Sequence, residues 1–171
     1  MNDQAERSTE FESFVHLVGK MNYVWTNTES LLIHFISGLL DIDNDKAVVI
    51  FLTVSTFRAR IDLVERLVKL PGTPTKLQSD VLELTSSFKQ LSATRNKYNH
   101  CIYAFDPDGG NPRTILMRIS DRKTGIKFGA ESAINQETVE AVQSSINQIS
   151  ALNTRIWAQL ISSGFVRADE R

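Results

Sequence analysis

The chain has 171 residues, of which 42% are hydrophobic and 23% charged, a composition typical of one ordinary globular domain. This excludes a collagen-like, low-complexity or intrinsically disordered chain. Nineteen Lys and Arg against twenty Asp and Glu leave a net charge of −1, which excludes a uniformly basic nucleic-acid binder or a strongly cationic membrane binder. Any anionic ligand must therefore be recognised by a local cluster of basic residues.

The cellular setting is indicated by what the sequence lacks. The single cysteine, Cys101, cannot form an internal disulfide, so no oxidising compartment is required. The N-terminal segment has no apolar signal core, and polar residues interrupt every apolar stretch before the ~20 residues that span a bilayer. His16 and His34 have no further ligand at metal-binding spacing. We therefore expect a soluble, cytoplasmic protein without a membrane partner, metal or cofactor.

Prolines and glycines interrupt the chain near residues 71–74 and 107–112. Elsewhere apolar residues recur every three or four positions, the period of a helix with one buried face. Thr9 and Glu12 form a capping-box pattern at the expected start of the first helix. The sequence therefore predicts one all-α domain over residues 1–171, an up-and-down bundle of four to five helices. Its helices are predicted over about 9–40, 45–70 and 74–105, and from the N-cap Asn135 to near the C-terminus.

The third predicted helix contains an arginine where the pattern calls for an apolar residue. Its apolar residues alternate spacings of three and four, and Arg95 occupies one of these positions. At about 100° per residue, Asn99, Tyr103, Asn96 and His100 all lie within about 140° of Arg95. Because arginine is seldom buried without a partner and histidine exchanges protons near neutral pH, this polar arc is a candidate site for an anionic ligand.

Residues 105–130 form the one predicted departure from helix. A turn-rich loop follows Phe105, and a short β-hairpin is expected with strands at 114–120 and 126–128 and a turn at 121–125. The segment has five basic residues, which we expect to contact an RNA backbone beside the polar arc; a solvated loop is the alternative. They are Arg113, Arg118, Arg122, Lys123 and Lys127.

The string Arg95-Asn96-x-x-x-His100, on the third long helix of a helical bundle, resembles the R-φ-x₃-H motif of the HEPN superfamily. The resemblance covers about residues 9–105 and the last helix, while the hairpin has no counterpart in it. It implies a bundle of four to five helices, homodimers in which two motifs meet at a shared cleft, and metal-independent endoribonuclease activity in many members. Such proteins act as toxins, in phage defence or in RNA processing, and a toxin would have an antitoxin partner.

Carried over by motif position, Arg95 would hold the scissile phosphate and His100 would act in acid–base catalysis. Asn96 would orient one of them or the RNA, while Asn99 and Tyr103 would contact RNA, the tyrosine by stacking on a base. RNA can be cleaved without metal because its own 2′-hydroxyl attacks the phosphorus, so the protein supplies a base, an acid and charge stabilisation.

Two alternatives remain at this stage. Some members of the superfamily are inactive modules that bind RNA, a nucleotide or a protein, and such a module is the first alternative to the endoribonuclease. A third possibility is a purely structural helical dimer, in which Arg95 pairs with an acid from another helix and His100 bonds a backbone carbonyl.

Overall fold

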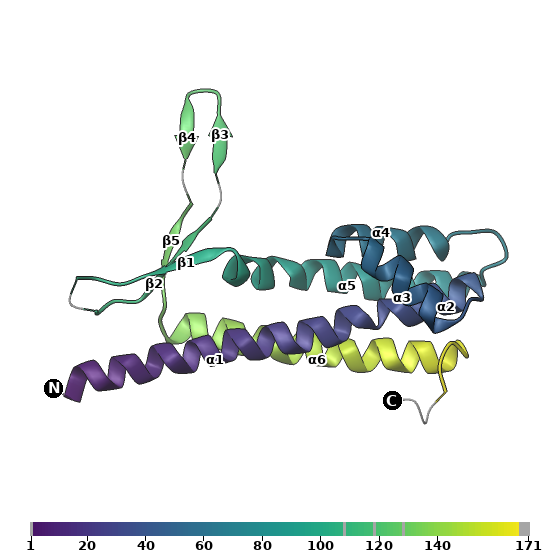
Figure 1. Cartoon of the computed structure of the whole chain (residues 1–171), viewed down its shortest axis with the longest axis horizontal. Helices are drawn as coiled ribbons and strands as arrows, with labels where there is room; N and C mark the ends of the chain where they lie inside the picture. The colour runs from purple at the N-terminus through teal and green to yellow at the C-terminus, as the bar shows by residue number, and fades with distance from the viewer. Residues whose placement is uncertain (1, 108, 118, 128, 168–171) are drawn as a thin grey trace. The chain divides into compact units, whose positions relative to one another are not determined.

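The computed structural model describes residues 2–107, 109–117, 119–127 and 129–167, and for residues 2–10 and 120–122 the backbone only. This part of the chain is mostly helical, with a small β insertion (Figure 1), so the predicted helical class with a β insertion is confirmed. The helices are α1 (Asn2–Ser30), α2 (Leu32–Leu40), α3 (Asn44–Thr53), α4 (Phe57–Leu67), α5 (Thr75–Asn99) and α6 (Gln136–Ser162). The strands are β1 (Cys101–Ala104), β2 (Arg113–Leu116), β3 (Ser120–Arg122), β4 (Gly125–Lys127) and β5 (Glu131–Ala133).

The chain divides into two compact units, and α1, α5 and α6 contribute to both. The first unit comprises Met1–Tyr23 and Ser92–Asn147 and contains the motif and all five strands; the second comprises Val24–Leu91 and Gln148–Arg171. The single-domain prediction concerns independent folding, which this division does not test.

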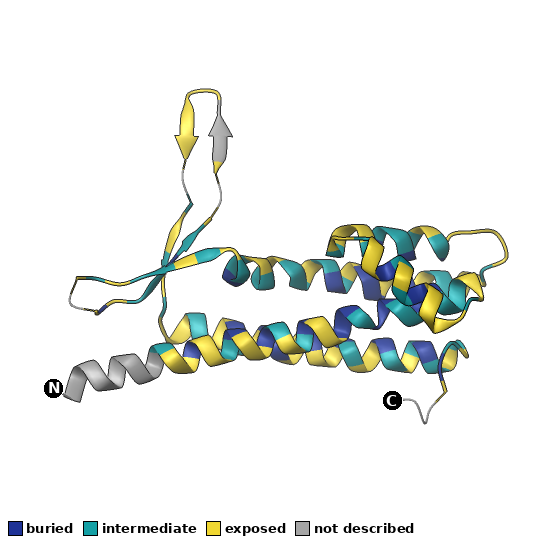
Figure 2. Cartoon of the chain, viewed as in Figure 1, coloured by how far each residue is buried: buried dark blue, intermediate teal, exposed yellow. Residues whose placement is uncertain are grey.

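The second unit has an aromatic core. Trp25, Phe57 and Phe88 pack against one another with ring centroids 4.5–4.8 Å apart. Buried residues lie on the inner faces of the helices (Figure 2), as the three-to-four spacing predicts. On α6 the buried residues recur at this spacing from the first unit into the second: Val142, Ile146, Ile149, Leu152, Ile156 and Leu160.

The helix predicted over 45–70 is in fact two helices, because residues 54–56 leave the helical conformation. Arg60 stabilises this break: its Nε donates to the carbonyl oxygens of Phe51 at 3.1 Å and Val54 at 2.8 Å, where α3 ends. Thr56 then caps α4 by accepting from the amide of Ala59. The break between α3 and α4 could not be predicted from periodicity alone, because the carbonyl groups at the end of α3 are bonded by an arginine side chain of α4.

The helix predicted over about 9–40 differs at its start and is interrupted, whereas its end and the start of the last helix agree with the predictions. The backbone of α1 is helical from Asn2, so Thr9 is not its N-cap, and the helix is interrupted at Leu31 before α2. Helix α2 ends at Leu40, and its C-cap Asp41 has a left-handed conformation with φ of 52°. Asn135 caps α6 as predicted, its Oδ1 accepting from the amide of Thr138 at 3.0 Å.

The strands of the first unit form two separate sheets. Strands β1, β2 and β5 make an antiparallel sheet in the order β1-β2-β5, with Cys101 opposite Leu116 and Arg113 opposite Ala133. Strands β3 and β4 form a two-stranded hairpin closed by Lys123 and Thr124, a shorter turn than predicted. The prediction that helix continues to Phe105 is wrong, because residues 101–104 pair with β2 instead.

Candidate functional site

The motif lies at the junction between the end of α5 and the start of β1. Helix α5 ends at Asn99, and the amide of His100 still bonds the carbonyl of Asn96 at 3.1 Å in helical fashion. The carbonyl of His100 accepts from the amide of Met117 at 2.8 Å. This bond lies immediately beside the antiparallel pairing of β1 with β2. The motif residues therefore lie on the last turn of a long helix, anchored at its end by a strand.

The guanidinium of Arg95 is held by asparagine side chains. Its Nη1 donates to Asn96 Oδ1 at 3.1 Å. The side-chain amide of Asn99 is oriented with its oxygen toward the guanidinium, because an NH₂ group there would place two hydrogen-bond donors against each other. The oxygen accepts from Arg95 Nε at 2.7 Å and from Nη2 at 3.1 Å. In the same orientation, Asn99 Nδ2 donates to Asn22 Oδ1 at 3.0 Å. Arg95 is half-buried and its plane is thus oriented by a chain of amides from two helices.

His100 differs from Arg95 in its surroundings. Its side chain is exposed and, among the described residues, makes no hydrogen bond or ion pair. The helical bond to Asn96 keeps His100 about 140° around the helix axis from Arg95. An exposed imidazole at the same helix end as an oriented guanidinium can exchange protons with a ligand that reaches both.

Tyr103 lies outside this arc, contrary to prediction, because it belongs to β1 rather than α5. Its hydroxyl donates to the carbonyl of Tyr98 at 3.3 Å, and its ring makes edge contacts with Phe11 and Phe14. Burial, together with hydrogen bonding and charge interaction with Cys101, raises the pKa of Tyr103. In this structure the tyrosine packs α1 against the sheet.

The five basic residues of the insertion do not share one environment. Arg113 donates to Asp106 at 2.9 Å and lies 3.4 Å from Glu131, so it is bound within the sheet. Lys123 and Lys127 are exposed on the β3–β4 hairpin. The side chain of Arg122 and the whole of Arg118 lie outside the described residues.

Asn22 is the site residue that the sequence analysis did not identify. It lies four residues after the buried Val18 on α1, so its polar side chain lies on the same face of the helix as the apolar residues. An amide on a helix face that is otherwise apolar is a signal for a buried polar contact. The partner 77 residues away has no such signature in the sequence.

Comparisons with family models, curated proteins and solved structures find no match for this chain. In the part of the chain that the structure describes, no helix is both long and apolar enough to cross a bilayer. Within the same residues, no group of three or more His, Cys, Asp or Glu side chains is placed to hold a metal ion.

Proposed function

We propose that this chain is a HEPN-type endoribonuclease that cleaves RNA without a metal ion, with Arg95 and His100 as its catalytic residues. The observation that carries the proposal is that the oriented guanidinium of Arg95 and the exposed His100 lie at the same end of one helix. The proposal includes the up-and-down arrangement of a HEPN bundle and a homodimer in which two motifs share a cleft.

In the proposed reaction a base removes the proton from a ribose 2′-hydroxyl, and its oxygen bonds to the adjacent phosphorus. The bond from phosphorus to the 5′-oxygen breaks, and that oxygen leaves with a proton from an acid. The products are a 2′,3′-cyclic phosphate and a free 5′-hydroxyl. His100 exchanges these protons, and Arg95 binds the phosphate oxygens as their negative charge increases.

The asparagines have supporting roles in this scheme. Asn96 and Asn99 orient the guanidinium by accepting from Nη1, Nη2 and Nε, which fixes its plane. Asn99 is thus a positioning residue rather than a direct RNA contact. The exposed Lys123 and Lys127 would bind phosphates along the strand, and Arg118 and Arg122 would add charge there. Toxin, phage-defence and RNA-processing roles all fit this chemistry, and an antitoxin would be a further partner.

A second candidate is an inactive module of the same fold that binds RNA without cutting it. The bonding of Arg95 to two amides favours this candidate, because donors used within the protein are not offered to a phosphate. The two candidates share the fold and differ only in cleavage.

The deciding experiment incubates the purified chain with RNA in excess chelator and examines the product ends. Cleavage that is lost in both Arg95→Ala and His100→Ala, with 5′ ends that accept a labelled phosphate directly, supports the nuclease. His16→Ala and Arg66→Ala, at exposed positions outside the motif, are matched controls that should cleave normally. Circular dichroism and melting temperature confirm that each variant folds.

Other results would redirect the assignment. RNA binding without cleavage in the wild type would replace the nuclease with the binding module. No binding and no cleavage, with a large fall in melting temperature for Arg95→Ala, would show that the motif serves a structural purpose.

A further inference from the structure

Tyr23 on α1 is the most exposed aromatic residue in the described part of the chain. It is 67% exposed, against 41% for Phe105, which packs on Phe11 with ring centroids 4.8 Å apart. Among the described residues, the Tyr23 side chain makes no hydrogen bond, ion pair or ring contact. Single exposed apolar residues are ordinary, so the position of Tyr23 relative to the motif decides what it can do.

Two contacts fix how α1 faces α5 near the motif. The rings of Phe14 and Tyr98 pack edge to face with centroids 5.6 Å apart, and Asn22 Oδ1 accepts from Asn99 Nδ2 at 3.0 Å. Around their own helices, Asn22 follows Phe14 by about 80° and Asn99 follows Tyr98 by about 100°. Within the first unit the two helices run antiparallel (Figure 1), so both rotations lead to the same side of the helix pair.

The same side of the helix pair carries Tyr23 and the motif histidine. Tyr23 lies about 100° beyond Asn22 on α1, and His100 lies about 100° beyond Asn99 at the end of α5. Both Tyr23 and His100 are exposed, as this placement requires. A ligand bound at the motif on this side would therefore meet the ring of Tyr23.

The surface beside Tyr23 has room for a flat ligand. Gly19, one turn earlier on the same face, has nothing within 4 Å of an added Cβ among the described residues, and Val15, a further turn back, is 44% exposed. Residues four apart lie on one face of a helix, so these positions form an apolar strip with a gap at the glycine. The guanidinium of Arg95 is joined to this part of α1 through Asn99.

We propose that Tyr23 stacks on a base of the RNA whose phosphate Arg95 binds, so that α1 forms a base-binding subsite beside the motif. The inference rests on the proposed RNA binding at the motif, and it applies whether or not the RNA is cleaved. A base and its phosphate are joined through one ribose, and every base has a flat face that an aromatic ring can contact. The subsite should therefore accept any base. The stacking role expected of Tyr103 is transferred to Tyr23, because Tyr103 packs against Phe11.

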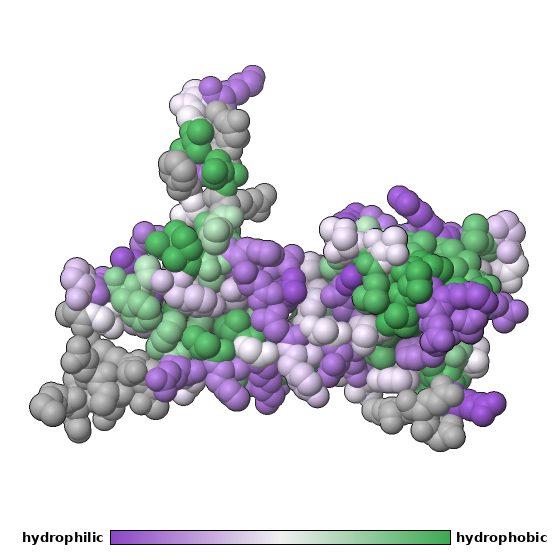
Figure 3. Space-filling view, in the orientation of Figure 1, coloured by the Kyte–Doolittle hydropathy of each residue, from purple (hydrophilic) through white to green (hydrophobic). Residues whose placement is uncertain are grey.

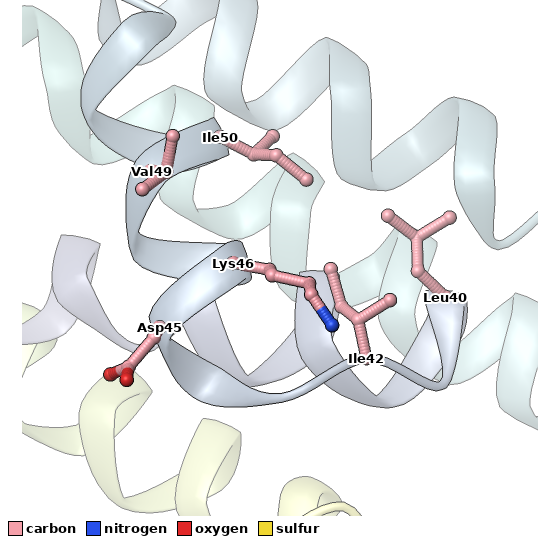
Figure 4. Close-up of a pocket in the computed structure, with 6 residues that line it drawn as sticks. All are labelled: Leu40, Ile42, Asp45, Lys46, Val49 and Ile50. Carbon is pink, nitrogen blue, oxygen red and sulfur yellow. The ribbon is translucent and has the colours of Figure 1, made fainter.

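A hollow in the second unit is an apolar surface with the opposite electrostatic character. It measures about 610 Å³ and is lined by Leu40, Ile42, Asp45, Lys46, Val49 and Ile50. Figure 3 shows hydrophobic side chains gathered over α2 and α3, and in Figure 4 Leu40, Ile42 and Ile50 surround the hollow. Residues 40–50 contain three aspartates and one lysine, a net charge of −2, so this surface repels an RNA phosphate. A variant at its exposed Val49 is therefore a suitable control.

The test measures the affinity of the full chain for two oligomers that cannot be cleaved. One is single-stranded 2′-O-methyl RNA, and the other is an abasic chain with the same sugar-phosphate backbone. Tyr23→Ala should bind the RNA about fivefold more weakly or worse, whereas Tyr23→Phe retains the ring and should bind it normally. Wild type and both variants should bind the abasic chain alike. Arg95→Ala should bind both oligomers more weakly, and Val49→Ala, at a residue 65% exposed, should match the wild type.

Proton NMR supplies a direct signature of stacking. The ring signals of Tyr23, identified by their loss in Tyr23→Phe, should shift upfield when the RNA oligomer is added and stay in place with the abasic chain. Circular dichroism verifies the fold of each variant.

The outcomes separate this subsite from the nuclease proposal. Equal RNA affinity of wild type and Tyr23→Ala would overturn the subsite even if the wild type cleaves RNA. Equal weakening toward the abasic chain would also overturn it, because the effect would then not depend on the base. A wild type that binds RNA through Tyr23 without cleaving it would support the subsite and remove the nuclease. A wild type that binds neither oligomer would overturn the subsite.

Discussion

The side-chain amide of Asn99 on α5 donates to Asn22 Oδ1 on α1 at 3.0 Å, and the amide oxygen of Asn99 accepts from Arg95. This contact between residues 77 positions apart links the motif to a second helix. It makes the orientation of the guanidinium dependent on α1 as well as on α5.

Replacing Asn99 should affect both stability and RNA binding. Asn99→Ala removes the acceptor of Arg95 and the donor to Asn22 Oδ1, and we expect a loss of about 1–3 kcal/mol in the free energy of unfolding, measured in urea. In Asn99→Asp the carboxylate still accepts from Arg95 but neutralises the positive charge of the guanidinium. This variant should therefore retain the fold while binding RNA more weakly. Asn27→Ala, at an exposed position on α1, is the control. Unchanged urea midpoint and RNA affinity in Asn99→Ala would show that the asparagine pair has no role.

The largest stability effect should come from Arg60. Its Nη1 bonds Glu29 Oε1 at 2.7 Å, Glu29 Oε2 accepts from Trp25 Nε1 at 2.9 Å, and the guanidinium lies 4.0 Å from the Phe51 ring centre. Arg60→Ala leaves a buried carboxylate without its ion-pair partner and should cost about 3–5 kcal/mol in urea unfolding. The exposed Arg58→Ala should change stability by less than about 0.5 kcal/mol. Equal effects would contradict this account of α3 and α4.

Two glycines should respond to alanine with opposite signs. A Cβ at Gly38 would fall within the Phe165 ring, so Gly38→Ala should destabilise the second unit by about 1–3 kcal/mol. Gly19, in the middle of α1, has nothing within 4 Å of an added Cβ, so Gly19→Ala should stabilise by about 0.5–1 kcal/mol. Thermal melts of both variants check this, and stabilisation by Gly38→Ala would refute the tight contact.

Glu65 makes stability sensitive to acid. Burial alone would raise its pKa, but hydrogen bonds from Lys89 and Thr85 and the charges of Lys89 and Lys69 outweigh burial and hold the pKa below its ordinary 4.5. Because the pKa of Glu65 is lower in the folded than in the unfolded chain, the ionised carboxylate stabilises the folded state above pH 4.5. This stabilisation is lost as the pH falls through the pKa of the folded state. Urea midpoints measured from pH 6 downward should therefore decline less steeply in Glu65→Gln. Identical slopes would indicate that this carboxylate contributes nothing to acid sensitivity.

The basic β3–β4 hairpin should contribute to the salt dependence of RNA binding. Neutralising Arg122 and Lys123 to Gln should weaken binding and reduce the slope of log affinity against log salt by about 0.7 for each RNA phosphate that the protein no longer neutralises. Arg66→Gln/Lys69→Gln removes the same charge from an exposed part of the second unit and should leave the slope intact. An unchanged slope in the hairpin variant would exclude these side chains from the RNA interface.

Helix faces were predictable from sequence, whereas contacts between distant segments were not. Phe14, Val18, Met21 and Trp25 are all buried as their spacing predicts, because periodicity places side chains on one face whatever the partner. The end of α5 was mispredicted since Ile102 and Phe105 continue the helical spacing. Residues 101–104 instead adopt a strand that pairs with β2, and the backbone bonds of that sheet outweigh local preference.

The candidate site shows the same division. Sequence alone determined that Arg95 and Asn96 lie on a long helix and that Asn135 begins the last one, since capping and periodicity act over a few residues, whereas the end of α5 at Asn99 came from the structure. Only the tertiary structure decided that Asn22 and Asn99 orient the guanidinium, that Tyr103 packs against Phe11, and that Arg60 divides a predicted helix in two. Such contacts depend on the geometry with which distant segments meet, and no local pattern of residues encodes that geometry.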